Sequence, residues 1–321
     1  MNNLKKVGLT ALAGALVSVS ANAADLAVSG GASISFGGEE GQTTGNGWSM
    51  NDSVTFTASG EMDNGWNVSV KQIIDSSDGG GTNAQVMDTR ILTIDMGDQG
   101  VLTFAGDGGS SVLDAIDDVT PTAGEESWDD VTGADTKTVI GGTGGNNMFH
   151  YSNSSLMDNL TISASYTPSD GSTQVESSND YGFKMVDLVE GLTIGGGAGE
   201  DNTTGTASVD ISNVYATYTM DAFSVGWQAS DFDSETANSD RDFTAYGLSY
   251  AVNDDVSVSI NQSEVEYEGG ASLSDQEATG ISVSYTMGSM SLSANHNSVD
   301  NIGGTSTDDR SGYALTLAFT F

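Results

Sequence analysis

The side chains of this sequence with the clearest capacity for chemistry are carboxylates gathered in one segment, residues 107–147. The group comprises Asp114, Asp117, Asp118, Glu125 and Glu126. The spacing of the three aspartates places them on one face of a helix. Grouped carboxylates attract cations and can hold Ca²⁺ weakly, although the spacing of an EF-hand calcium loop is missing. The segment predicts an ion-attracting surface and no other cofactor.

The opposite face of this predicted helix is apolar. Its members are Val112, Ala115, Ile116 and Val119. Ser110 or Ser111 can cap the start, and Pro121 prevents the helix from continuing past Thr120. A short helix of this kind suits a loop that packs its apolar side on a wall and turns its acidic side toward open space. The alternative is a solvated acidic surface loop, which the residues after Pro121 also fit.

Basic side chains are few, and four of them occupy the same alternate strand positions as small or polar residues. These four are Lys71, Lys184, Arg241 and Arg310. We therefore expect them on the polar, inner face of their strands. They either face the acidic segment across an open space or pair with inner carboxylates, and the sequence leaves both interpretations open.

The composition excludes several functions. With 45 acidic and 8 basic residues the net charge is −37, which opposes nucleic-acid binding because phosphates require clusters of Lys and Arg. The chain has no cysteine, so thiol catalysis and zinc–thiolate sites are excluded. Its two histidines, His150 and His296, are isolated on predicted strands and suggest no catalytic pair.

The elements that must position these residues are strands. About sixteen segments alternate apolar with small or polar residues, as in residues 160–167 and 223–232. Tight turns such as Asp221-Ala222 and Gly288-Ser289 alternate with long polar connections. So many two-faced strands leave no residues for a soluble core, and short turns on one side with long loops on the other are typical of an outer-membrane barrel.

The N-terminal segment and the remainder of the chain support this interpretation. We expect residues 1–23 to be a cleaved secretory signal peptide, since Lys5 and Lys6 precede an apolar run that ends in Ala21-Asn22-Ala23. Residues 24–321 then form one domain without any run of ~18 apolar residues, so spanning a membrane requires a closed barrel. We predict an all-β, transmembrane antiparallel barrel with a short helix in its long third loop, residues 107–147.

The chain resembles the general porins of Gram-negative outer membranes and is most similar to those of the alphaproteobacterial, Rhodobacter-like type. The resemblance rests on the end of the signal segment, the opening strand from Leu26, the stretch from Leu113 to Val119 and the terminal Phe321. It covers all of residues 24–321.

This resemblance implies a sixteen-stranded homotrimeric barrel in the bacterial outer membrane, surrounded by lipid and lipopolysaccharide. It also implies a water-filled pore, constricted by the third loop, for passive diffusion of ions and small hydrophilic solutes. The family commonly places an arginine-rich wall opposite the acidic loop. This sequence has few cations for such a wall, which favours cation preference. Two alternatives are a substrate-selective channel and, with less support, a barrel enzyme.

Overall fold

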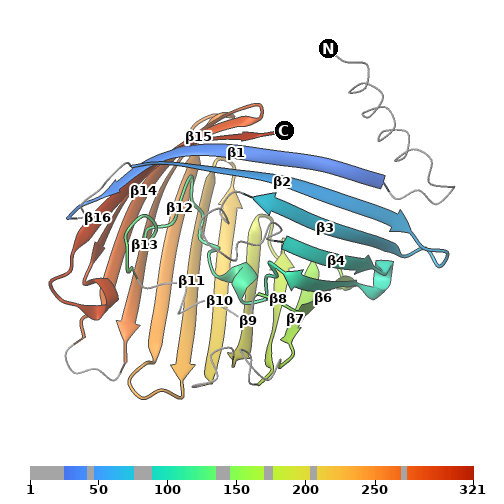
Figure 1. Cartoon of the computed structure of the whole chain (residues 1–321). Helices are drawn as coiled ribbons and strands as arrows, with labels where there is room; N and C mark the ends of the chain where they lie inside the picture. Colours follow the sequence, from blue (N-terminus) through green and yellow to red (C-terminus); the bar gives the residue numbers. More distant parts are fainter. Residues whose placement is uncertain are drawn as a thin grey trace, which may run out of the picture.

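The computed structural model describes residues 25–41, 47–75, 89–134, 145–169, 176–202, 208–268 and 273–321. Sixteen antiparallel strands follow one another around a closed barrel, and β1 pairs with β16 to complete it (Figure 1). The predicted all-β barrel is confirmed. The predicted signal peptide, residues 1–23, lies outside the described residues.

The strands have the following bounds: β1 Asp25–Glu39, β2 Trp48–Glu61, β3 Asn67–Asp75, β4 Thr89–Asp95, β5 Val101–Asp107, β6 Met148–Met157, β7 Leu160–Thr167, β8 Ser178–Val186, β9 Leu192–Asp201, β10 Val209–Met220, β11 Phe223–Ser234, β12 Arg241–Ala251, β13 Val256–Tyr267, β14 Gln276–Met287, β15 Met290–Asp300 and β16 Arg310–Thr320. Three short 3-10 helices are η1 Gly97–Gln99, η2 Asp114–Ile116 and η3 Ile302–Gly304. No helix of the described residues is long and apolar enough to cross a membrane.

Alternation along each strand separates an apolar outer face from a polar inner one. On β10, Val214 and Tyr218 face outward and are 50% and 38% exposed, whereas Asn213 and Tyr215 face inward and are buried. The outward apolar side chains have no protein layer over them in the described barrel. The arrangement is that of a barrel whose outer face is covered by lipid.

The seam between β1 and β16 fixes the end of the chain. The amide N–H of Gly30 donates to the carbonyl of Phe321 at 2.8 Å, and the Phe321 amide donates back at 2.9 Å. Further along the seam, the hydroxyls of Ser35 and Thr316 lie 2.9 Å apart. The last residue therefore contributes to barrel closure.

Short turns join the strands at one end of the barrel. Asp221 has φ of 52° in the two-residue turn between β10 and β11, and Gly288 has φ of 63° between β14 and β15. Positive φ at these positions matches the twist of the flanking strands. The longer connections that the structure describes in full, residues 235–240 and 301–309, lie at the opposite end, as the sequence predicts.

The connection from β5 to β6, residues 108–147, is called the inner loop below; its residues 135–144 lie outside the described part. The short helix expected in it is present only as the 3-10 turn η2, not as a helix over residues 110–120. The backbone amides of Val112, Leu113 and Val119 donate instead to side chains of the barrel wall. These tertiary hydrogen bonds replace the ones that a regular helix would have formed within itself.

Candidate functional site

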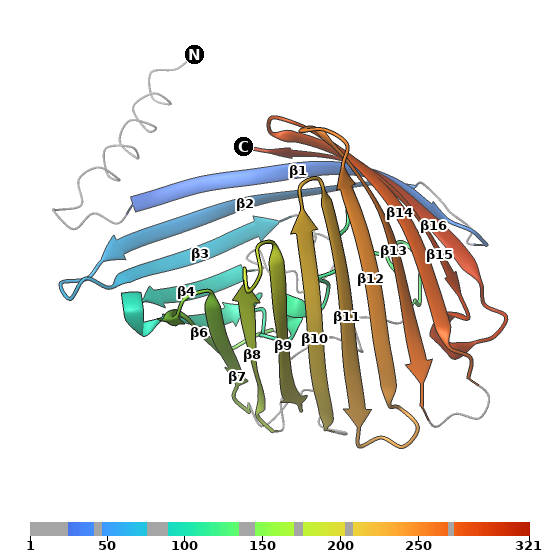
Figure 2. The ribbon, with the colours of Figure 1, turned by 180° about the vertical axis from the view of Figure 1, so that it is seen from behind.

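The inner loop lies inside the barrel, where Figures 1 and 2 show it in green. Its described residues follow the inner face of the wall from β7 to β16. At the far end the hydroxyl of Thr132 donates to the Glu39 carboxylate on β1 at 2.7 Å. The loop therefore lines much of the inner circumference and narrows the space enclosed by the strands.

The first arm of the loop is fixed by a carboxylate on β8. The amides of Val112 and Leu113 donate to the two carboxylate oxygens of Asp180 at 3.4 and 3.0 Å. The Val112 amide also donates to the Ser165 hydroxyl at 3.0 Å. Leu113 has no exposed surface, and Val112 is 5% exposed. Of the predicted wall-facing residues, Val112 is buried and Ile116 is half-buried, but Ala115 is exposed. Leu113, which the helical pattern misses, is buried against the wall in place of Ala115.

A row of amide side chains holds the middle of the loop. Asn213 donates to the Ile116 carbonyl at 2.9 Å, and Gln228 donates to the Asp117 carbonyl at 2.8 Å while accepting from the Val119 amide at 3.2 Å.

The row continues on later strands. Asn261 donates to the Pro121 carbonyl at 3.1 Å, and Asn297 bridges the carbonyls of Glu126 and Asp129 at 2.8 and 2.7 Å. Strands β10, β11, β13 and β15 each supply such an amide, so the irregular loop backbone finds partners across the wall.

Glycines make room for the loop where it crosses the strands. A Cβ on Gly182 would lie 2.7 Å from Val112 Cγ1, and one on Gly247 would lie 2.7 Å from the Pro121 carbonyl oxygen. On Gly280 a Cβ would lie 2.9 Å from Ser127 Cα. These inward-facing positions are therefore small because the loop packs directly on the backbone of the wall.

The second arm carries the apolar core of the molecule. Trp128 packs edge-on against Phe243 with ring centroids 5.2 Å apart, in a cluster with Ala245 and Val265. Val131 packs with Ala278, Val299 and Ile302. Trp128 and Val131 are not among the predicted site residues; their three-residue spacing within an acidic stretch is the sequence signal that could have indicated them.

The predicted carboxylates all lie on this loop. Asp118 and Glu125 are exposed, whereas Asp114, Asp117 and Glu126 are half-buried. The structure gathers Glu125 and Glu126 with Asp129, whose carboxylate oxygens lie within 4.8 Å of one another. Such a group could hold a metal ion, although one oxygen from each carboxylate fills only part of the six to eight positions that Ca²⁺ takes.

Crowding changes the charge of this group. Burial, together with the hydrogen bond to Asp129, raises the pKa of Glu126 to about 8. Although part of its side chain is exposed, Glu125 is close enough to the surrounding protein that desolvation, together with the nearby charges of Asp129, Asp130 and Asp118, raises its pKa. At pH 7 the Glu126 carboxyl is therefore mostly protonated, and the loop carries less negative charge than its sequence suggests.

The two predicted arginines are held at the wall. Arg310 Nη1 lies 2.5 Å from the Glu39 carboxylate, and its Nε lies 2.8 Å from Asp308. Arg241 lies over the rings of Phe232 and Tyr267, with its guanidinium carbon 5.8 and 5.6 Å from their centroids. Neither contact is with the predicted loop carboxylates.

The two predicted lysines are exposed on the inner face. Lys71 on β3 pairs in register with Thr57 and Ile91, on the wall formed by β2–β4. Lys184 on β8 lies two residues beyond Gly182, which faces the loop. Neither lysine has an ion-pair partner among the described residues.

A barrel of sixteen strands with a long loop folded against its inner wall can be compared with known proteins. Residues 8–321 match the family described as Gram-negative porin. The chain belongs to this porin family. As a porin it is an outer-membrane channel protein and not an enzyme, and the resemblance found from the sequence is confirmed.

Solved structures show the same fold at low sequence identity. A loop-deletion mutant of OmpT, an outer membrane protein of Vibrio cholerae, is 16% identical to this porin, with a TM-score of 0.70 over 94% of this chain and 100% of the other. An anion-selective porin from Comamonas acidovorans is 13% identical, with a TM-score of 0.70 over 93% and 100%. A mutant of the Rh. blastica porin is 13% identical, with a TM-score of 0.68 over 92% and 100%. No curated protein sequence matches this porin.

Proposed function

We propose that this porin forms a water-filled channel for passive diffusion of ions and small hydrophilic solutes, and that the channel prefers cations. The observation that supports the preference is the separation of charges inside the barrel. Carboxylates follow the inner loop, while Arg241 and Arg310 are engaged by aromatic rings and by Glu39 and Asp308.

The wall opposite the loop adds little positive charge. Its inward-facing residues on β1–β4 are mainly hydroxyl-bearing, including Ser33, Ser35, Thr55, Thr57 and Thr93. Lys71 is the basic residue that faces inward among them. Lys71 and Lys184 together are outnumbered by the carboxylates of the inner loop, which leaves a net negative potential in the narrow part of the channel.

The proposed assembly is a homotrimer embedded in outer-membrane lipid and lipopolysaccharide. A solved OmpT structure from Vibrio cholerae, 13% identical to this chain, is described as a trimer form. Passive diffusion requires no cofactor. The proposal also includes weak binding of Ca²⁺ by Glu125, Glu126 and Asp129, where the ion would lower the local negative charge.

Reversal potentials across a planar bilayer in a salt gradient test the proposed selectivity. We expect cation preference at 0.1 M salt that weakens toward 1 M, where the Debye length falls from ~10 to ~3 Å. Replacing Asp114, Asp117 and Asp118 together by Asn should reduce the preference with little change in conductance.

A matched control removes three exposed carboxylates from tight turns, with Asp63→Asn, Asp158→Asn and Asp254→Asn. We expect this variant to keep the wild-type reversal potential. Anion preference of the wild type at low salt would contradict the proposal. Ohmic conductance that is blocked by one solute would favour the substrate-selective alternative.

A further inference from the structure

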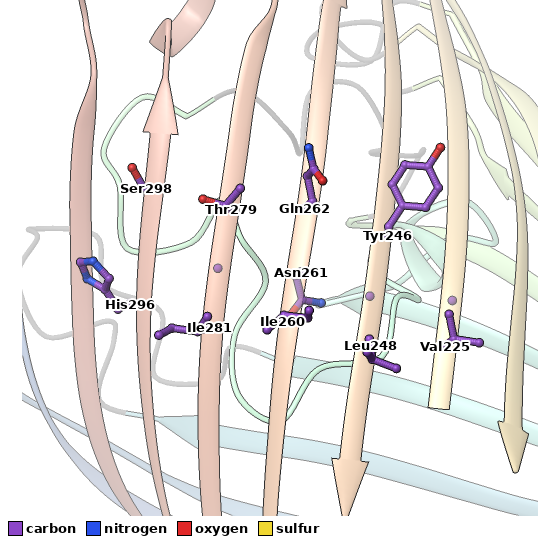
Figure 3. Close-up of a pocket in the computed structure, with 13 residues that line it drawn as sticks. Val225, Tyr246, Leu248, Ile260, Asn261, Gln262, Thr279, Ile281, His296 and Ser298 are labelled. Atoms are coloured by element: carbon purple, nitrogen blue, oxygen red, sulfur yellow. The ribbon is translucent and has the colours of Figure 1, made fainter. Parts of the chain in front are cut away.

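The barrel wall has hollows on both of its faces. The hollow on the outer face crosses β11–β15 and is lined by outward side chains such as Leu248, Ile260 and Ile281, with the inner loop behind the strands (Figure 3). A second hollow, of about 460 Å³, lies on the wall formed by β16, β1, β2 and β3. We call this second hollow the wall pocket.

The wall pocket opens to the lumen. It is lined by two consecutive rows of residues that pair in register across these strands. The first row consists of Thr320, Gly31, Ser53 and Asp75, and the second of Ala318, Ser33 and Asn51. Both rows share the inward parity of Ser35 and Thr316, which form the next row along the seam. The residues that line the pocket therefore belong to the inner face of the barrel.

The inner loop leaves this part of the wall open to the channel. Its hydrogen bonds to the wall, described above, are made with strands between β7 and β15 and, at the far end, with Glu39. Glu39 is the last residue of β1, six residues beyond Ser33. Asn51 and Thr320 are exposed, and Ser33, Ser53 and Asp75 are half-buried. A solute in the lumen can therefore reach these side chains.

Gly31 gives the pocket its depth. It has no side chain, and Thr320 and Ser53 stand on either side of it, two strand spacings or about 9.4–9.8 Å apart. A Cβ at Gly31 would lie 3.1 Å from the carbonyl oxygen of Phe319, so the backbone of the neighbouring strand is close as well. A small ring can lie over the glycine with a hydroxyl group on each side of it.

The polar groups around this hollow combine donors and acceptors. A serine or threonine hydroxyl does both, the amide of Asn51 has two donors and an acceptor, and the carboxylate of Asp75 only accepts. Asp75 already interacts within the protein, but a carboxylate offers about four acceptor positions. No basic side chain is among the described residues that line the pocket, so an anionic solute finds no counter-charge there. Groups that both donate and accept, such as adjacent hydroxyls, match this set.

We propose that the wall pocket is a weak binding subsite for a small neutral solute with several adjacent hydroxyl groups, of which a monosaccharide is the simplest example. The proposal rests on the diffusion function above and specifies one class of solute for it. Each hydrogen bond to the wall replaces one to water, so the net gain is small and exchange is fast. Transport requires binding of this strength, because the solute must also leave. The subsite retains the solute briefly while ions continue to pass.

Analysis of current noise from the porin in a planar bilayer tests the proposal. The probes are glucose and a methyl-capped polyethylene glycol of the same hydrodynamic size. The ether oxygens of the polymer accept hydrogen bonds but do not donate to Asp75. We expect glucose to add current noise that saturates at millimolar concentration while the mean current stays ohmic. The polymer should lower the current in proportion to its concentration and add no saturable noise.

Two variants locate the subsite. Ser53→Ala with Thr320→Val removes two hydroxyls beside Gly31 and should raise the half-saturating glucose concentration about tenfold or more. Gly31→Val fills the hollow without changing charge and should remove the saturable noise. Ser69→Ala with Thr93→Val is the matched control, because these inward residues pair in register on β3 and β4 outside the pocket. Heat-dependent mobility in gel electrophoresis confirms that each variant is a folded barrel.

The outcomes separate this subsite from the diffusion function. Ohmic, cation-preferring conductance with equal noise from glucose and the polymer would overturn the subsite and leave the diffusion function intact. Unchanged glucose noise in both pocket variants, or its loss in the control variant, would also overturn the subsite. A folded wild-type barrel without any conductance would overturn the diffusion function and the subsite with it.

Discussion

Glu126 shows how strongly burial changes a single carboxyl of the inner loop. Its side chain is half-buried beside Asp129, and its pKa is raised to about 8. An acid with a raised pKa is neutral below that value and gains a negative charge above it. Because the folded state holds this proton more tightly than the unfolded chain, the contribution of Glu126 to stability falls as the pH rises from about 4.5 to about 8.

We expect the cation preference of the wild type to increase between pH 7 and pH 9 as Glu126 ionises. Glu126→Gln, which resembles the protonated acid, should match the wild type at pH 7 and lose most of this increase. Reversal potentials at a fixed salt gradient measure both. Asp63→Asn, at an exposed turn, is the control and should titrate like the wild type. A wild-type preference that stays constant over this range would show that Glu126 is already ionised at pH 7.

At the scale of elements, the inner loop depends on the wall more than on its own secondary structure. Its carbonyls accept from the amides of Asn213, Gln228, Asn261 and Asn297, and the 3-10 turn η2 is three residues long. Its position therefore depends on side chains from several strands.

Leu113→Asp should release the first arm of the loop. Leu113 is fully buried, and burying an unpaired carboxylate costs several kcal/mol, a cost that the loop avoids by undocking. Single-channel recordings should show larger or noisier conductance. Ala115→Asp adds the same charge at an exposed position two residues away and should keep a quiet, wild-type conductance. Identical traces from the two variants would mean that charge, and not docking, controls the conductance.

Gly247→Val should displace the middle of the loop. Its side chain would begin 2.7 Å from the Pro121 carbonyl oxygen and 2.9 Å from the Pro121 nitrogen, and overpacking of this kind costs about 1–3 kcal/mol. We expect altered conductance with an intact barrel, shown by an unchanged heat-dependent mobility in gel electrophoresis. Gly60→Val is the control, because a Cβ there has no atom within 4 Å. Wild-type conductance in Gly247→Val would mean that the loop does not rest on β12.

At the scale of the whole molecule, the net charge of −37 opposes the compact state. Neighbouring strands place carboxylates in register, as in the row of Glu264, Glu277 and Asp300. The barrel is held together by its closed hydrogen-bond network and by lipid on its outer face, and neither depends on ionic pairing.

The temperature at which the barrel unfolds should therefore rise with salt. Screening shortens the range of repulsion from ~10 Å at 0.1 M to ~3 Å at 1 M. Heat-dependent mobility after incubation in 0.05, 0.15 and 0.5 M NaCl measures this in one nonionic detergent. The same series with the Arg310→Gln variant tests whether the pairs of Arg310 with Glu39 and Asp308 oppose the trend. An unfolding temperature that falls as salt increases would show that attractive ion pairs outweigh the repulsion.

The sequence by itself determined the barrel, because alternation has a period of two and each strand shows its own two faces. The alternation predicts a strand over residues 160–167, and β7 has these bounds. Turn residues such as Asp221 and Gly288 likewise favour turn conformations by their own chemistry, so the local sequence is enough to predict these turns. The inward parity of Lys71 and Lys184 followed from the same period.

The tertiary structure decided where the inner loop lies and which side chains it buries. The helical pattern placed Ala115 on the wall and missed Leu113, since the loop backbone bonds to Asp180 and Gln228 in place of itself. The engagement of Arg310 with Glu39 joins residues at opposite ends of the chain, and that contact exists only once β1 and β16 close the barrel. A local pattern cannot specify such a contact, because its partners are brought together by closure and not by spacing along the chain.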